Sequence, residues 1–505
     1  MRLQLLGGSY VARSSIANLQ RCVNYFPERN PQGADSPETL YQRPGMRKLA
    51  SPGVAGPGRG IFQASNGNGY AVVGSNVYYV TPPPNWGFQL LGAIATGRTN
   101  PVSQVDNGTT ALLVDGSSQG WNINIATNAF SQFQDPTSTF QGADRVDYID
   151  TFVLWNQPGT NRFASTLSNV LTIDPTYVAA KTDWPDPLQT LIVCQHFIIL
   201  LGTFKSEIWF DAGNAQFPFA ELPGSLIEHG IVAKYSVAQS DIAIFWLGRD
   251  LQGQGVVFRY MGYQTTRVSN HALEYAIRQL YLQGIPISDA IGYTYQQDGH
   301  VFYVLSFPAG DQTWAFDMAT EEWSQRAWSD SNGTLHRDRS SLCAALYGYN
   351  VTLDRETGDL LLLDLNYYMD DYLGIQMPIH YIRSFQHYSE ASPTGTGRTP
   401  QLFHLPAEGR RLRFTRFVVD METGTTEGTL GAGSAGEVSL RWSDDRGKTF
   451  GNAVLQSTGR LGEYATYPQW QSLGVARDRV WEISHSLTGP AALQGAWVDA
   501  EVLQS

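Results

Sequence analysis

This sequence is short of charge. Only 16% of its 505 residues are Asp, Glu, Lys or Arg, where about 25% is usual in soluble globular proteins. Basic residues are the scarcer kind, with 34 Lys and Arg against 46 Asp and Glu, and the formal net charge is -12. A general nucleic-acid binder is excluded, because phosphate binding needs an excess of basic side chains. Disorder is also excluded, because 42% of the residues are hydrophobic and can build a core.

Cysteines and long hydrophobic runs are rare as well. The three cysteines, Cys22, Cys194 and Cys343, are widely spaced and form no CxxC pair. We therefore expect free, buried thiols rather than a disulfide framework or a thiolate zinc site. The N-terminus has no apolar run of signal-peptide length. The most hydrophobic stretch, residues 188–201, is too short and too polar to span a bilayer. We expect a soluble protein made in the cytoplasm, without stable membrane insertion.

Glycine and aromatic residues are abundant, with 50 Gly and 12% Phe, Trp and Tyr, and they favour sheets and tight turns. A hairpin-like unit recurs, with copies that start at residues 70, 111, 152, 198, 244 and 301. The intervals are 41, 41, 46, 46 and 57 residues, and a hairpin every 40–50 residues or about that is the spacing of four-stranded propeller blades. A stacked or sandwiched β arrangement is the alternative. We predict an all-β fold with a propeller-like body, for which six blades are favoured and seven are possible. A further copy from Leu342 to residue 364 is either a blade or a strand that closes the ring.

One helix is predicted at residues 271–283. Its apolar residues Leu273, Ala276, Ile277 and Leu280 share one face, and Gly284 stops it. We expect the helix to pack against the edge of a sheet.

The pattern changes after about residue 375. Alternating segments near residues 413–420, 438–442, 480–484 and 496–502 predict a smaller β-sandwich-like domain. We divide the chain into an N-terminal basic docking segment (1–60), the propeller-like body (61–375) and a C-terminal β domain (376–505). Polar, Gly-rich stretches near 391–400 and 423–436 predict mobile loops in that last domain.

Motifs for catalysis and cofactor binding are weak. Residues 116–120 match GxSxG, but a strand rather than a helix follows them. Residues 431–436 match GxGxxG, but no strand precedes them and no helix follows. Asp364, Asp370 and Asp371 have the chemistry of a Ca²⁺ site or an acid pair, yet no EF-hand frame surrounds them, so a solvated loop is favoured. The nine histidines show no helical metal-site spacing. We predict no catalytic residue, no cofactor and no metal ligand.

The segment from Ser443 to Phe450 fits the Asp-box pattern S-x-D-x-G-x-T-aromatic, with Asp445, Gly447 and Thr449 at the inner positions. The carboxylate can cap the turn amides, the glycine supplies the turn geometry and the aromatic ring packs inward. Asp boxes recur in sialidase propellers, where they fold hairpins away from the catalytic centre. A single copy therefore predicts a structural turn.

Several longer stretches carry a family resemblance. Residues 8–28, Gly-Ser-Tyr-Val-Ala-Arg-Ser-Ser-Ile-Ala-Asn-Leu-Gln-Arg-Cys-Val-Asn-Tyr-Phe-Pro-Glu, resemble the N-terminal signature of the tail nozzle proteins of short-tailed phages. These are also known as tail hub or packaged-DNA stabilisation proteins. Matching stretches follow in the same order, among them residues 43–46, 156–163, 245–250 and 441–445.

The resemblance implies a ring of six copies in the virion, assembled in the host cytoplasm. Such a ring extends the channel of the portal and adaptor proteins, lets genomic DNA exit without specific binding, and mounts a tail needle or plug and tailspikes or fibres. The family has no catalytic motif to transfer.

Charge is unevenly spread along the chain. Residues 1–100 hold nine basic and three acidic residues, a net of +6, so the remainder carries -18. This is either chance clustering or a basic docking segment on an acidic body. On the second hypothesis, Arg13, Arg21 and Arg29 dock onto an acidic adaptor surface, and the acidic body lines the bore and repels DNA.

Two other functions are open at this point. A carbohydrate-binding propeller that recognises a receptor is suggested by the 13 Trp residues and the Asp box. A glycosidase would need two carboxylates about 5–9.5 Å apart in a cleft.

Overall fold

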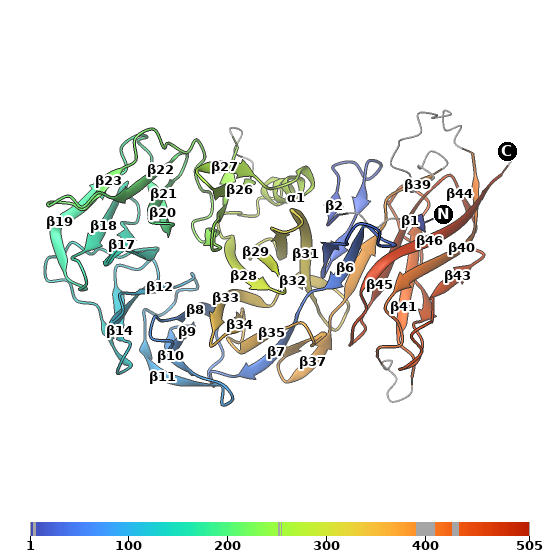
Figure 1. The fold of residues 1–505 in the computed structure, drawn as a ribbon, viewed down its shortest axis with the longest axis horizontal. Helices are drawn as coiled ribbons and strands as arrows, with labels where there is room; N and C mark the ends of the chain where they lie inside the picture. The colour runs from blue at the N-terminus through green and yellow to red at the C-terminus, as the bar shows by residue number, and fades with distance from the viewer. Residues whose placement is uncertain are drawn as a thin grey trace.

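The computed structural model describes residues 2–3, 7–250, 253, 255–389, 410–426 and 434–503, and within them the chain is almost entirely β (Figure 1). Part of it forms a ring of blades and the rest a β-sandwich beside the ring. The loop predicted at 391–400 and residues 427–433 of the second predicted loop lie outside the described residues.

Seven four-stranded blades make up the ring. Blade 1 consists of β8 (Gly58–Gln63), β9 (Gly69–Val73), β10 (Asn76–Thr81) and β11 (Gly87–Ala93). Blade 2 consists of β12 (Ser103–Asp106), β13 (Thr110–Val114), β14 (Gly120–Asn124) and β15 (Ala129–Gln132). Blade 3 consists of β16 (Val146–Ile149), β17 (Phe152–Asn156), β18 (Arg162–Thr166) and β19 (Ile173–Ala180).

Blades 4 to 6 continue in the same order along the chain. Blade 4 consists of β20 (Leu188–Cys194), β21 (Phe197–Gly202), β22 (Ser206–Asp211) and β23 (Phe219–Glu221). Blade 5 consists of β24 (Ala238–Gln239), β25 (Ile244–Arg249), β26 (Gly255–Met261) and β27 (Gln264–Arg267). Blade 6 consists of β28 (Ile291–Gln297), β29 (His300–Phe307), β30 (Gln312–Asp317) and β31 (Glu322–Ser329).

Blade 7 is completed from the far end of the chain. It consists of β33 (Ser340–Leu346), β34 (Tyr349–Asp354) and β35 (Leu360–Asp364), to which β7 (Gly45–Ala50) adds as the fourth strand. Leu363 pairs with Met46 in this ladder. The favoured count of six blades is thus corrected to seven. The further copy near residues 342–364 is a blade, and a repeat read along the chain could not show that its fourth strand comes from the N-terminal region.

The blades pack face to face through apolar side chains. Each blade's second strand is buried on both faces and is therefore a nearly continuous hydrophobic run, as in β21 and β25. Ile199 and Trp246 lie in the core between blades 4 and 5. Val73 and Leu353 lie in the core between blades 1 and 7, which closes the ring.

The two faces of the ring are built by different connections. Because neighbouring strands are antiparallel, the turns between first and second strands and between third and fourth strands lie on one face. The turns between second and third strands and the connections between blades lie on the other, which we call the interblade face. Helix α1 (His271–Leu282) is part of that face, in the connection between blades 5 and 6.

The predicted helix is confirmed. Asn270 caps it by accepting a hydrogen bond from the Leu273 amide at 2.9 Å. Leu273, Ile277 and Leu280 are buried. Gly284 follows the helix with a φ of +74°, which side chains other than glycine rarely adopt. No helix in the described residues is long and apolar enough to cross a membrane.

The C-terminal domain is a β-sandwich, as predicted. One sheet has the order β43 (Gln469–Gln471), β40 (Leu412–Met421), β46 (Leu493–Val502), β6 (Glu38–Gln42) and β5 (Tyr25–Arg29), with β1 (Arg2–Leu3) and β44 (Val475–Ala476) at its margins. The other contains β38 (Tyr381–Ser384), β45 (Asp478–His485), β41 (Glu437–Ser443) and β42 (Val454–Ser457), with β39 (Tyr388–Ser389) beside β45. Phe414, Phe417 and Trp481 fill the core between them.

The first 60 residues do not form a separate segment. The short strand β4 (Cys22–Val23) lies between β31 of the propeller and β38 of the sandwich, so one continuous sheet runs from blade 6 into the C-terminal domain. Strands β5 and β6 belong to the sandwich and β7 to the propeller. The N-terminal residues are therefore shared between both domains, and the structure sets no boundary at residue 60.

Proline substitutions test the closure of the ring. Met46 is buried in β7 between β35 and β36 (Met369–Tyr372), and its amide donates to Asp370. We expect Met46→Pro to lower the free energy of unfolding by about 3 kcal/mol or more, measured by urea denaturation. Leu90→Pro, in the exposed outer strand β11, is the control and should cost clearly less. Equal losses would show that β7 does not hold the ring closed.

Candidate functional site: the N-terminal clasp

The N-terminal clasp, which we define as residues 7–50, joins the two domains. Val23 pairs with Gln325 of blade 6 on one side and with Ile382 of the sandwich on the other. The Gly8 carbonyl accepts a hydrogen bond from the buried Arg383 guanidinium at 3.0 Å. Because each contact reaches a residue more than 300 positions away in the sequence, the clasp can only form in the complete fold.

Asn24 is the central side chain of the clasp. Its Nδ2 donates to the Ala327 carbonyl at 2.9 Å and to the His380 carbonyl at 2.8 Å. Its Oδ1 accepts from the Ala327 amide at 2.8 Å and from Arg43 Nε at 3.0 Å. All four hydrogen-bonding positions of the amide are thus used. The backbone φ of 62° lies in the left-handed region, which Asn tolerates better than most residues. One buried side chain therefore ties the clasp to blade 6 and to the linker before the sandwich.

Arg43 carries this network onward to β36. Its Nη1 and Nη2 form a bidentate ion pair with the Asp370 carboxylate, at 3.1 and 2.6 Å, and both side chains are 2% exposed. Burial raises the pKa of Asp370, and the Arg43 charge opposes the rise. The favoured interpretation of a solvated loop is thus wrong for Asp370, because a buried guanidinium pairs with it. Asp364 pairs with Arg47 at 3.2 Å, and Asp371 accepts from the Lys48 amide at 2.8 Å.

The basic residues near the N-terminus are largely used inside the molecule. Most of them pair with acidic residues far along the chain, and the pairs are Arg21–Glu482, Arg43–Asp370, Arg47–Asp364, Lys48–Asp359 and Arg59–Asp115. Five of the nine basic residues in the first hundred are therefore paired with the acidic remainder within one molecule.

The three arginines predicted to dock onto an adaptor lie in different surroundings. Arg13 is exposed on the hairpin between β2 (Tyr10–Val11) and β3 (Leu19–Gln20), and it has no ion pair among the described residues. Arg21 is paired with Glu482 at 3.3 Å. Arg29 donates to the Thr320 carbonyl at 3.1 Å. Arg21 is thus paired within the molecule, whereas Arg13 and Arg29 have no ion pair among the described residues.

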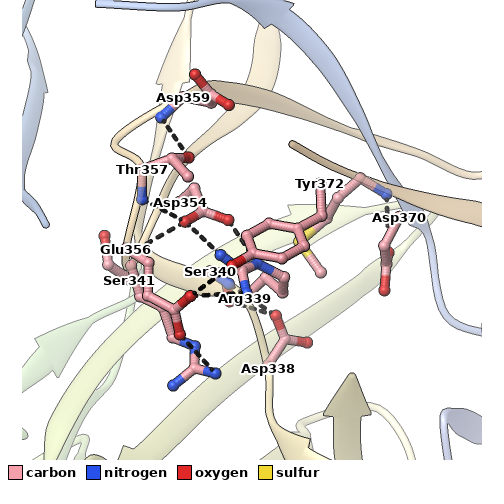
Figure 2. Close-up of polar contacts among 12 residues, drawn as sticks. Asp338, Arg339, Ser340, Ser341, Asp354, Glu356, Thr357, Asp359, Asp370 and Tyr372 are labelled. Carbon is pink, nitrogen blue, oxygen red and sulfur yellow. Dashed lines mark hydrogen bonds and ion pairs between the residues drawn. The ribbon is translucent and has the colours of Figure 1, made fainter. Parts of the chain in front are cut away.

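A second charged cluster fixes blade 7 (Figure 2). Arg339 forms a bidentate ion pair with Asp354 at 2.6 and 2.7 Å, and its Nη1 reaches Glu356 at 3.2 Å. The Tyr372 ring lies 3.6 Å from the guanidinium carbon, and its hydroxyl donates to Glu356 at 3.0 Å. Asp354 also accepts from the amides of Glu356 and Thr357, both at 2.8 Å. The charged groups of this cluster are paired with one another. We therefore interpret the cluster as a structural contact that holds β36 against blade 7.

The Asp box forms the predicted turn between β41 and β42. Asp445 accepts from the amides of Lys448 and Thr449 at 3.0 and 2.9 Å and from the Thr449 hydroxyl at 2.6 Å. These hydrogen bonds hold the pKa of Asp445 well below its usual range. Gly447 has a φ of +82°, and its amide donates to the Ser443 hydroxyl at 2.8 Å.

The surroundings of the Asp box differ in part from expectation. Phe450 is half-buried beneath the Arg441 guanidinium, 5.0 Å from the ring centre, rather than packed in the core. A Cβ on Gly447 would meet Leu19 Cδ2 at 2.3 Å, so this turn abuts β3 of the clasp. Among the described residues, no group of three His, Cys, Asp or Glu is placed to hold a metal ion.

His485 lies buried where the clasp meets the sandwich. Its Nε2 is 2.5 Å from the Tyr25 hydroxyl of β5, and its Nδ1 accepts from the Leu487 amide at 3.3 Å. Burial, helped by the nearby His380, lowers the pKa of His485 to about 3. The neutral imidazole therefore belongs to the folded state, since protonation would abolish the acceptor at Nδ1.

Two family models match the chain. The model described as Bacteriophage P22 Gp10, beta-propeller matches residues 1–354, and the one described as Bacteriophage P22 Gp10, beta-sandwich matches residues 401–501. The chain belongs to the bacteriophage P22 Gp10 family. It is therefore a structural protein of a phage tail and a component of the virion, and the resemblance to the tail nozzle proteins is confirmed. The first match covers most of the propeller together with β5 and β6 of the sandwich, and the second covers the sandwich strands from β40 onward.

Similarity to other solved structures is remote. A streptogramin B lyase structure is 9% identical, with a TM-score of 0.39, and the match covers 64% of this chain and 97% of the lyase. The WD40 β-propeller domain of Doa1 is 8% identical, with a TM-score of 0.39, and the match covers 63% of this chain and 96% of that domain. At these values the likeness bears on neither mechanism nor partners. No match was found among the curated proteins.

Replacing Asn24 tests the clasp. Asn24→Gly keeps the left-handed backbone accessible but leaves buried groups of Arg43 and Ala327 without partners. We expect the free energy of unfolding to fall by roughly 3 kcal/mol, because each such group costs about 1–3 kcal/mol. Urea denaturation measures the loss. Asn169→Gly, at an exposed turn with the same φ of 62°, is the matched control and should change stability little. Similar losses in both variants would rule out a special role for Asn24.

The buried His485 predicts sensitivity to acid. Its pKa is lower in the folded protein than in the unfolded chain, so the unfolded state binds the extra proton between about pH 6.5 and pH 3. The contribution of His485 to the free energy of unfolding is thus fully present above about pH 6.5. It falls, by up to about 1.4 kcal/mol per pH unit, as the pH drops through that window. Unfolding of His485→Gln over the same pH range should show a shallower slope. His196→Gln, an exposed control, should keep the slope of the unmodified protein.

Proposed function

We propose that this protein forms the ring-shaped tail nozzle that extends the portal and adaptor channel, helps to retain packaged DNA and lets it exit at infection. The observation that carries the proposal is the match to the P22 Gp10 family over both domains. The nozzle is a homohexamer, assembled in the host cytoplasm, and we assign it no enzymatic activity. Its partners are the portal-adaptor proteins above it, and a tail needle or plug and tailspikes or fibres below or beside it.

The interlocked domains support a mechanical role. The sheet that passes through β4 and the Asn24–Arg43–Asp370 network leave no simple hinge between propeller and sandwich. A wall that confines DNA has to transmit force without yielding at a linker. A clasp that is hydrogen-bonded to both domains meets that requirement better than a flexible tether would.

The charge balance supports passage of DNA without binding. Six copies at -12 each carry a formal charge of -72. Five of the nine basic residues in the first hundred are already paired internally, so fewer remain in that segment to neutralise phosphates. DNA affinity depends on such neutralisation. A ring of this composition lets DNA pass without holding it, and Arg13 is the residue that we retain as a contact to an acidic adaptor.

Electron microscopy of virions tests the proposal. We expect a six-fold ring of this protein below the portal and adaptor, and we expect particles made without it to lose their DNA, measured as genome protected from nuclease. The isolated ring should bind duplex DNA weakly, even at low salt. A monomeric protein in the virion, or particles that retain DNA without it, would contradict the proposed function.

A further inference from the structure

A large cavity opens on the interblade face between blades 4 and 5. Its volume is about 1120 Å³. The residues on which the argument rests are Trp184, Phe204, Lys205, Arg249, Phe258 and Arg267. They come from the connection between blades 3 and 4, the turn between β21 and β22, the end of β25, and strands β26 and β27. The cavity thus lies where the loops of two neighbouring blades converge, apart from the clasp.

The rim of the cavity carries two exposed aromatic rings. Trp184 is 42% exposed and Phe204 is 54% exposed, although both side chains are large and apolar. The Lys205 ammonium lies 4.4 Å from the centre of the Trp184 ring, and the Arg249 guanidinium lies 5.3 Å from that of Phe204. Each ring therefore positions a cation at the rim. Deeper in the cavity, His229 stacks on Phe258 at 4.2 Å, and burial lowers the pKa of this histidine, which keeps it neutral.

The three cations of the cavity differ in how they are neutralised. Lys205 pairs with Glu228 at 2.8 Å, and Arg267 pairs with Glu274. Arg249 has no ion pair among the described residues, and its Nε is buried without a hydrogen-bond partner. A buried guanidinium nitrogen without a partner is costly. Stacking on Phe204 holds the planar group in one orientation, which suits bidentate contact with a carboxylate.

We propose that this cavity binds an acidic segment of a partner polypeptide. A carboxylate of the segment pairs with Arg249, and a neighbouring apolar side chain enters the space between Trp184, Phe204 and Phe258. Tryptophan and arginine are the residues on which protein-protein contacts most often depend. The volume exceeds the roughly 300–1,000 Å³ usual for a small ligand and leaves room for several residues of a chain.

A saccharide fits the cavity less well. Each exposed ring has a cation over it, which occupies a face on which a sugar ring would stack. Several of the polar side chains that could hold hydroxyls are already paired, Glu228 with Lys205 and Arg267 with Glu274. An acidic peptide needs one unpaired cation and an apolar surface, and the cavity supplies both.

The probe is an array of twelve-residue peptides with a central Asp or Glu beside Leu, Phe or Trp. Each peptide has a copy in which the acid is replaced by Asn or Gln. Labelled full-length protein is applied to the array, and affinities of the strongest sequences are measured in solution by fluorescence anisotropy. Hexuronic-acid oligosaccharides and inorganic phosphate are measured in parallel.

We expect acidic peptides to bind and their amide copies to bind at least tenfold more weakly. Arg249→Gln should weaken binding at least tenfold, and Phe204→Ala should weaken it while leaving the charge in place. Arg98→Gln, an exposed arginine on the same face but outside the cavity, is the control and should not affect binding. Thermal unfolding of each variant shows that the fold is kept.

Three outcomes would overturn the proposal. One is that no acidic peptide binds the folded protein. Another is that Arg249→Gln binds the same peptides as strongly as the unmodified protein does. The third is that the oligosaccharide alone binds in an Arg249-dependent way, which would make the cavity a glycan site.

Discussion

The buried amide of Asn24 is the constraint on which the two-domain body depends. Both of its donors and both of its acceptor positions form hydrogen bonds, with blade 6, with the linker before the sandwich and with Arg43. Arg43 then fixes Asp370 beside β7, the strand that completes the ring. Ring closure, domain attachment and the burial of an ion pair are thus coupled. A change at one of them alters the other two, so the propeller and the sandwich behave as one unit although each has its own core.

The net charge of the chain does not show which of its charged residues are paired with one another. Basic residues near the N-terminus are matched to acidic residues that follow them by tens to hundreds of positions, and two of these pairs, Arg43–Asp370 and Arg59–Asp115, are buried on both sides. A buried pair adds little net stability, because the cost of removing both charges from water offsets their attraction. Their arrangement explains why a positively charged segment need not be a docking tail, because its partners are supplied by the same chain.

The parts of the fold that depend on neighbouring residues were predictable from the sequence. The hairpin repeat marked the second strand of blades 1 to 6, the helix followed from its apolar face and Gly284, and the Asp box identified its turn. The parts that depend on distant residues were not. The Leu363–Met46 pairing joins residues far apart, and Arg43 reaches Asp370 across 327 positions. The residues next to Asn24 and Arg249 in the sequence give no sign of their roles. The burial of Asn24 and the lack of an ion-pair partner for Arg249 among the described residues appear only in the folded molecule.

The direction of synthesis gives the clasp a further consequence. A ribosome releases residues 7–50 well before their partners in β31, β38 and β46, because synthesis proceeds at about 5–20 residues per second and the partners lie about 300 or more positions further along the chain. Arg2 in β1 likewise pairs with Trp497 in β46, near the end of the described residues. A growing or truncated chain can form single blades but cannot close its ring or seat its sandwich. Only the finished polypeptide can therefore close the ring and complete the sandwich.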